Sequence, residues 1–167
     1  MGLYRKARRY MSFPIAIKLM YIEAYFYLAW GRVFKLFPFQ KVSPSLGEHM
    51  KETPYAGYTE QELSLVRQIS RAVHAMSRVT WWESQCLVKA VAAMKMLERR
   101  GISSTFYLGS GRDDKGMMVA HAWLRCGSYI VTGREGHERY AVVGIFGRDM
   151  GAGGLNLKRP SDKEFLH

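Results

Sequence analysis

Cys86 and His121 are the two residues whose types and surroundings could do chemistry together. Cys86 precedes an apolar stretch, residues 87–97, and His121 follows 35 residues later inside a run, 120–123, that is typical of a strand. The N–H groups at the start of a helix and a neighbouring imidazolium both stabilise a thiolate. This layout predicts a cysteine nucleophile paired with a histidine. The alternative is that Cys86 is a buried, inert thiol.

A third group usually orients the imidazole of such a pair. Glu135 is our first candidate, because a three-residue turn in the expected hairpin would pair it with His121. A two-residue turn at Gly127-Ser128 would instead pair His121 with Arg134. The carboxylates at 113–114 precede the strand, and their loop would have to fold back to reach the imidazole.

The second cysteine, Cys126, lies five residues after His121 and therefore on the opposite face of a strand without a bulge. We expect it to be a small core residue, with a Cys86–Cys126 disulfide as the alternative. Trp123 shares the face of His121. No other histidine has ligand spacing with a second His or Cys, so we expect neither a metal nor another cofactor. These histidines are His49, His74, His137 and His167.

The first half of the chain predicts an N-terminal helix and a linker. Ser12 and Pro14 are typical of a helix start, and the helix would run to about Phe37 before Pro38 ends it. Residues 38–58 are rich in proline and glycine, which indicates a loop or linker.

Two more helices are expected between residues 59 and 101. Thr59 with Glu62 fits a capping box that begins the first of them. Thr80 or Ser84 would cap the second, which places Cys86 in its first turn or about one turn deeper. This second helix is apolar almost all round, as buried helices are, and Gly101 is its expected end.

Beyond Gly101 the sequence changes to short runs typical of strands, at 104–108, 117–126, 129–132 and 140–146. A polar turn is expected at 109–116 and an irregular tail from Gly147. Helices followed by strands predict an α+β fold, in which the buried helix of the nucleophile packs on one face of an antiparallel sheet.

The net charge is +11, from 25 Lys and Arg against 14 Asp and Glu. This excess favours acidic partners such as anionic lipid or an acidic peptide. We expect no nucleic acid, since no recognition motif accompanies the charge.

The apolar stretch 13–39 is interrupted by Lys18, Glu23, Arg32 and Lys35, so no uncharged run approaches the ~20 residues of a spanning helix. No signal-peptide cleavage site follows it. We expect a cytoplasmic protein whose first helix packs on its own domain or a partner, with peripheral contact to a membrane surface as the alternative.

Three runs together resemble the transglutaminase-like leader peptidases of lasso-peptide biosynthesis. A tryptophan-led run at 82–90 carries Cys86, a glycine turn follows at 97–102, and 120–124 carries His121. The resemblance covers roughly residues 60–147, and the aromatic N-terminal helix is similar too. It implies a papain- or transglutaminase-like core at 58–167, behind an N-terminal helical region and linker at 1–57.

The resemblance implies a cysteine protease that cuts a ribosomally made precursor peptide between leader and core. Cys86 would be the nucleophile and His121 the general base and then the acid, with Trp82, Gln85 and Trp123 near the substrate and the oxyanion. The implied partners are the precursor, a separate leader-recognition protein and an ATP-dependent lasso cyclase.

One departure from the family pattern concerns the third role. The family can carry an aspartate about a dozen residues after the histidine, and Thr132-Gly133 stands at that place here. Two other functions remain open: transglutaminase-type acyl transfer, in which an amine resolves the thioester, and a non-catalytic basic adaptor that binds peptides.

Overall fold

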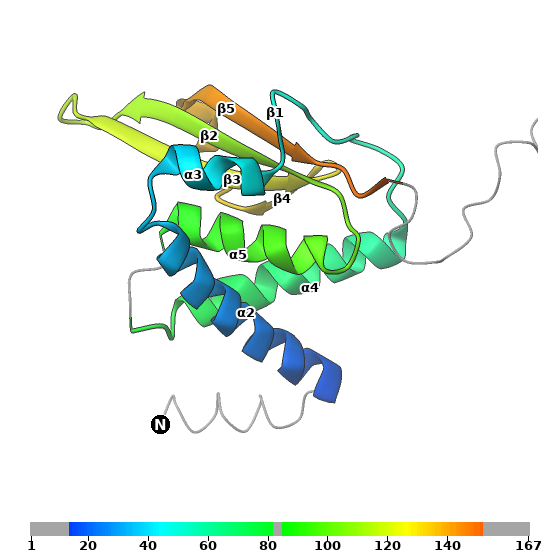
Figure 1. Ribbon diagram of the computed structural model, residues 1–167. Coiled ribbons are helices and arrows are strands. Elements are labelled where there is room, and N and C mark those ends of the chain that lie inside the picture. The colour runs from blue at the N-terminus through cyan, green and yellow to red at the C-terminus, as the bar shows by residue number, and fades with distance from the viewer. Residues whose placement is uncertain (1–13, 82–84, 152–167) are drawn as a thin grey trace, which may run out of the picture.

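The computed structural model describes residues 14–81 and 85–151. Its helices pack on one face of a sheet, with α5 and α4 next to the strands and α2 beyond them (Figure 1). The helices are α2 (Ile15–Phe34), α3 (Phe39–Val42), α4 (Glu60–Ser77) and α5 (Cys86–Glu98). The strands are β1 (Glu48–His49), β2 (Ser104–Arg112), β3 (Met118–Cys126), β4 (Tyr129–Thr132) and β5 (Ala141–Arg148). They form one antiparallel sheet in the order β1-β5-β2-β3-β4, which confirms the α+β class.

The capping box at the start of α4 is confirmed. Thr59 Oγ1 accepts a hydrogen bond from the Glu62 N–H at 3.2 Å, and Glu62 Oε2 accepts one from the Thr59 N–H at 2.8 Å. Two backbone donors that the helix itself cannot satisfy are thereby paired. One side of α4 then buries Val66, Ile69 and Val73 in the core.

The linker expected at 38–58 is only partly correct. The N-terminal helix begins after Pro14 as predicted, but α2 ends at Phe34 rather than near Phe37. The following segment forms α3, a 3₁₀ helix (Ser43–Leu46) and β1. Local turn signals miss β1 because it has only two residues, and its partners on β5 lie about a hundred positions later.

Helix α5 begins later than the predicted caps imply, by one residue for Ser84 and by five for Thr80. Its N-cap is Gln85, and Cys86 is its first residue, which excludes Thr80 as the cap; Ser84 lies outside the described residues. The helix ends as predicted. Gly101 has φ +66° and donates to Glu98 O, and the next N–H, of Ile102, donates to Leu97 O, which is the Schellman arrangement.

Strand β3 has two different faces because its side chains alternate. Ala122, Leu124 and Cys126 belong to the hydrophobic core that includes α5. Cys126 is buried and both cysteines are free, so its expected role as a core residue is confirmed and the disulfide is excluded. Trp123 and Arg125 lie on the other face.

Arg125 fastens the segment before α4 to this second face. Its guanidinium donates to Thr53 O, Gly127 O and the Tyr107 hydroxyl at 2.7–2.9 Å, and it stacks 3.7 Å from the centre of the Tyr55 ring. The side chain is almost fully buried. Burial of a cation is tolerated because its donors are satisfied.

Several strand ends differ from the sequence prediction. β2 continues to Arg112, because its pairing with β3 extends to Arg112↔Met118. The polar turn is therefore shorter, and the Asp113 carboxylate accepts from two of its N–H groups, at Lys115 and Met117. β5 continues to Arg148. None of the helices in the described part of the chain is long and apolar enough to cross a membrane.

The contact between α2 and α5 depends on Gly31. A Cβ at this position would lie 2.9 Å from Val88 O and 3.2 Å from Val88 Cγ1. We predict that Gly31→Leu lowers the free energy of unfolding by about 1–3 kcal/mol through overpacking, measured by urea denaturation. The exposed Ala16→Leu on the same helix is the control and should stay within about 0.5 kcal/mol of wild type. Equal stability of the two variants would contradict the tight contact.

Candidate active site

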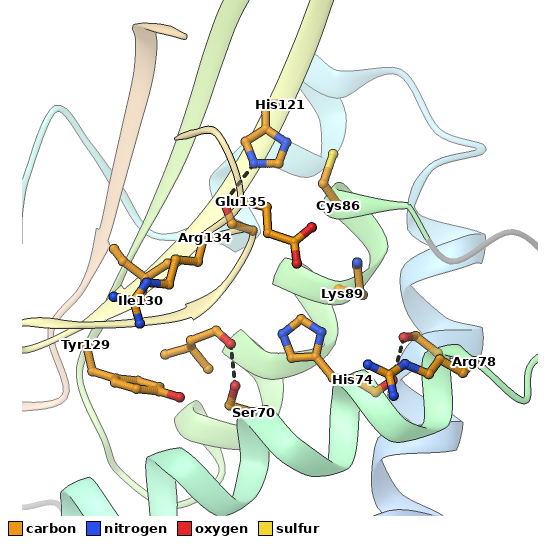
Figure 2. Close-up of a pocket in the computed structure, with 13 residues that line it drawn as sticks. Ser70, His74, Arg78, Cys86, Lys89, His121, Tyr129, Ile130, Arg134 and Glu135 are labelled. Carbon is orange, nitrogen blue, oxygen red and sulfur yellow. Dashed lines mark hydrogen bonds between the residues drawn. The ribbon is translucent and has the colours of Figure 1, made fainter. Parts of the chain in front are cut away.

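Cys86 and His121 line one pocket of about 560 Å³. Its walls come from α4, the first turn of α5, β4 and the segment that follows β4 (Figure 2). His121 has no partner on β4, whose pairing with β3 stops at Leu124↔Thr132, so the edge of β3 beside His121 is open. The structure thus brings the two residues together at this edge.

Cys86 lies where a helix favours negative charge. As the first residue of α5 it carries one of the N–H groups that have no acceptor within the helix. These groups form the positive end of the helix dipole. The side chain is half-buried and faces the pocket (Figure 2). The positive end of the helix would therefore favour negative charge on the sulfur and on an oxyanion bound beside it.

His121 is held through one ring nitrogen. Its Nε2 lies 2.8 Å from Gly133 O. A carbonyl oxygen only accepts, so Nε2 carries the hydrogen and, in the neutral ring, Nδ1 is left as the acceptor. Figure 2 shows this second nitrogen on the side of the ring turned toward Cys86. Among the described residues, no hydrogen bond yet joins the thiol to the imidazole.

Gly133 can take this position only because it has no side chain. Its φ is +75°, and a Cβ would lie 2.4 Å from Ala122 O and 2.8 Å from Trp123 Cβ. An L side chain would therefore be strained and would collide with the backbone of β3. The close approach aims the Gly133 carbonyl at His121.

The hairpin register explains why neither predicted partner lies opposite His121. The turn has two residues, as Cys126↔Tyr129 shows, but the register shifts before Leu124↔Thr132, so β4 carries one extra residue there. The ladder ends at Thr132. Arg134 and Glu135 therefore come after the last paired position.

Glu135 is one of the exposed residues that line the pocket. In the described part of the chain it makes no hydrogen bond with His121, whose Nε2 is occupied by Gly133 O. The leader peptidases that the sequence resembles can carry an aspartate about a dozen residues after the histidine. In this chain Thr132 and Gly133 occupy that place. A backbone carbonyl thus stands where a carboxylate was expected, and a role for Glu135 as third member stays a prediction.

Aromatic rings hold His121 from the side. Trp123 and Tyr140 stack on it, with ring centroids 5.9 and 4.9 Å away. Gly109 on β2 pairs with His121, and a Cβ there would lie 2.7 Å from Tyr140 Cβ and 2.8 Å from the Trp123 ring. Trp123 is itself buried against Tyr107, so it packs against the imidazole rather than lining the pocket.

The other two residues expected near the substrate are placed differently. Gln85 caps α5, and its side-chain oxygen accepts a hydrogen bond from Lys35 at the end of α2. It is exposed and is not part of the pocket wall. Trp82 lies outside the described residues.

Sequence reasoning missed the contribution of α4. Ser70, His74, Ser77 and Arg78 line the pocket, and their spacing of i, i+4, i+7 and i+8 places them on one helix face. That polar face was the available signal. Burial lowers the pKa of His74, and the nearby cation Lys89 lowers it further. His74 is therefore neutral at pH 7.

Comparison with known families agrees with this arrangement. Residues 30–144 match the family model of the Transglutaminase-like superfamily, a span that holds both Cys86 and His121. No curated protein and no solved structure matches the chain significantly.

The two cysteines should differ sharply in reactivity. Burial raises the pKa of Cys126 to about 12, so it is a protonated thiol at neutral pH. Cys86 is half-exposed on the pocket wall. We predict that iodoacetamide modifies folded protein once, at Cys86, as read by peptide mass spectrometry. Cys86→Ala should abolish the modification and Cys126→Ala should leave it. Modification of Cys126 in the folded protein would contradict this assignment.

Proposed function

The chain belongs to the transglutaminase-like superfamily, and we propose that it is a cysteine peptidase that releases the leader from a lasso-peptide precursor. The superfamily includes cysteine proteases and acyltransferases. One observation carries the proposal: Cys86 at a helix N-terminus shares a pocket with a histidine whose Nε2 is held by Gly133 O. The finer choice of substrate rests on the three sequence runs that resemble the leader peptidases.

Acylation of the enzyme would use both residues. His121 Nδ1 accepts the proton of the Cys86 thiol, and the sulfur attacks the carbonyl carbon of the scissile bond. The oxyanion that forms accepts a hydrogen bond from the Cys86 N–H. The imidazolium then gives its proton to the leaving amine, the C–N bond breaks, and a thioester remains.

Deacylation would reverse the roles of the same groups. His121 Nδ1 takes a proton from water, and the resulting hydroxide attacks the thioester carbonyl. The C–S bond breaks, the sulfur recovers a proton from the imidazolium, and the peptide leaves with a new carboxylate. The Gly133 carbonyl keeps Nε2 protonated throughout both halves.

Acyl transfer differs only in the second half, where an amine replaces water. Membership of a superfamily that includes acyltransferases favours it as the second candidate. A trapped amine product in place of the free acid would select this alternative. A non-catalytic adaptor would give neither product.

The partners follow from the same resemblance. We propose that the precursor reaches this chain through a separate leader-recognition protein, and that the ATP-dependent cyclase acts on the freed core in the cytoplasm. The excess positive charge supports attraction of acidic segments of these partners.

Cleavage of the precursor tests the proposal directly. Wild type, Cys86→Ala, His121→Ala and Cys126→Ala are compared with the recognition protein present, and mass spectrometry detects the released leader. We expect Cys86→Ala and His121→Ala to lose at least about 10³-fold in rate, as variants of a nucleophile and its base do. Cys126→Ala should retain cleavage. Undiminished cleavage by folded Cys86→Ala would contradict the cysteine-peptidase mechanism.

The role of the Gly133 carbonyl gives a sharper prediction. Gly133→Ala should lower kcat by about 10–100-fold with little change in KM, because the imidazole loses its orientation. Gly136→Ala is the matched control. Gly136 also has a left-handed φ, of +70°, but a Cβ there meets nothing closer than 3.9 Å. Both variants carry a similar backbone strain of about 1–2 kcal/mol, so an equal loss in kcat would contradict the orienting role.

A further inference from the structure

Three cations line the pocket beside Cys86. Arg78 is the C-cap of α4, Lys89 comes from α5 and Arg134 from the segment after β4 (Figure 2). In the described ranges 14–81 and 85–151, none of the three makes a side-chain ion pair or hydrogen bond. Glu135 is the one carboxylate among the residues that line the pocket, and among the described residues no ion pair within 4.0 Å joins it to any of the three.

Lys89 is the cation closest in sequence to the nucleophile. It follows Cys86 by three residues on α5, so both project from one face of the helix. It is half-buried, whereas Arg78 and Arg134 are exposed. A cation that is partly removed from water without a direct ion pair is unfavourable, and a bound carboxylate in contact with it would relieve that cost. Lys89 also helps to lower the pKa of the neighbouring His74. This is the effect expected of a positive charge in the pocket.

We propose that this pocket binds an acidic side chain of the substrate next to the bond that Cys86 attacks. This inference rests on the proposed function and adds a substrate class to it. Lys89 would pair with the carboxylate in the interior of the pocket, and Arg78 and Arg134 would screen its entrance. Neutral substrates of the same size would lack this interaction.

Matched fluorogenic octapeptides test the proposal. Each pair carries Glu or Gln at one position around the scissile bond, and kcat/KM is measured for both. We expect one position at which Glu is preferred by about tenfold, the effect of one ion pair worth about 1.4 kcal/mol. Lys89→Met should abolish the preference, whereas Lys115→Met in the distant β2–β3 turn should retain it.

A binding measurement separates failure of this inference from failure of the proposed function. Cys86→Ala protein cannot form the thioester, so fluorescence anisotropy reports binding of the same peptides without turnover. Tighter binding of the Glu peptides that disappears in the Cys86→Ala, Lys89→Met double variant would support the acidic subsite even if wild type cleaved none of them. Equal binding and equal cleavage of Glu and Gln peptides at every position would overturn it.

A second inference rests on the outer face of α2. Six large apolar side chains at intervals of three or four residues are between 44% and 74% exposed. They are Ile15, Leu19, Ile22, Phe26, Trp30 and Val33. We call them the α2 stripe. Exposed apolar surface of this extent marks an interaction site rather than an ordinary protein surface.

The surroundings of the α2 stripe favour a lipid surface. Exposed Leu36, Phe37 and Phe39 continue the apolar surface past the end of the helix, which suits a broad layer better than a single partner helix. By their helical spacing, Lys18 and Arg32 lie along one side of the stripe. On the other side, Arg99 and Arg100 reach Glu23 and line the groove beside Phe26.

We propose that the α2 stripe lies on an anionic membrane surface, with its aromatic side chains in the headgroup region. The opposite face of α2 is already buried in the protein core, so only this face is available. The flanking cations and the net charge of +11 supply attraction to anionic lipid. The end of α2 contacts Gln85 through Lys35, so the active site would lie close to the same surface.

Co-sedimentation with vesicles tests this proposal. We expect binding to phosphatidylcholine mixed with phosphatidylglycerol, and weaker binding to phosphatidylcholine alone or at high salt. Phe26→Ser with Trp30→Ser should weaken binding by about 10–100-fold, from the loss of two half-exposed aromatic side chains. Val143→Ser, an exposed apolar residue on β5, is the control.

Two results would overturn the lipid proposal. One is sedimentation that the double variant leaves unchanged. The other is a wild-type dimer in light scattering that the double variant converts to monomer, because a second copy would then cover the stripe.

Discussion

The candidate site depends on the contact between Gly133 and β3. The chain leaves β4 there with a left-handed backbone and passes so close to Ala122 that no side chain fits. This approach fixes the direction of the Gly133 carbonyl, and the carbonyl fixes the ring of His121. Aromatic packing by Trp123 and Tyr140 then limits the remaining rotation of the imidazole.

The sequence predicted the parts of this arrangement that depend on local chemistry. The Thr59 capping box, the glycine end of α5 and the buried character of that helix follow from residues within one or two turns. The alternation of β3 is also local, and it correctly separated Cys126 in the core from His121 and Trp123. Those signals sufficed for the α+β class and for the pairing of Cys86 with His121 in one pocket.

The features that escaped prediction depend on contacts between distant segments. The strand β1 exists because β5 supplies its partner, about a hundred positions later in the chain. The orienting group escaped for a different reason. Residue types reveal side-chain acceptors only, whereas the acceptor here is a backbone carbonyl whose position depends on one extra residue in β4.

In the proposed mechanism, a backbone carbonyl that orients His121 would tie catalysis to the fold more tightly than a carboxylate would. A carboxylate is carried by one side chain, so a single substitution can remove it and leave the backbone in place. The Gly133 oxygen can only be moved by moving the chain, which requires a change in β3, β4 or the aromatic layer over Gly109. A neutral oxygen also stabilises the imidazolium less than a charged one does. In the proposed mechanism, the helix N-terminus at Cys86 would therefore supply more of the stabilisation once the proton has moved from the thiol to the imidazole.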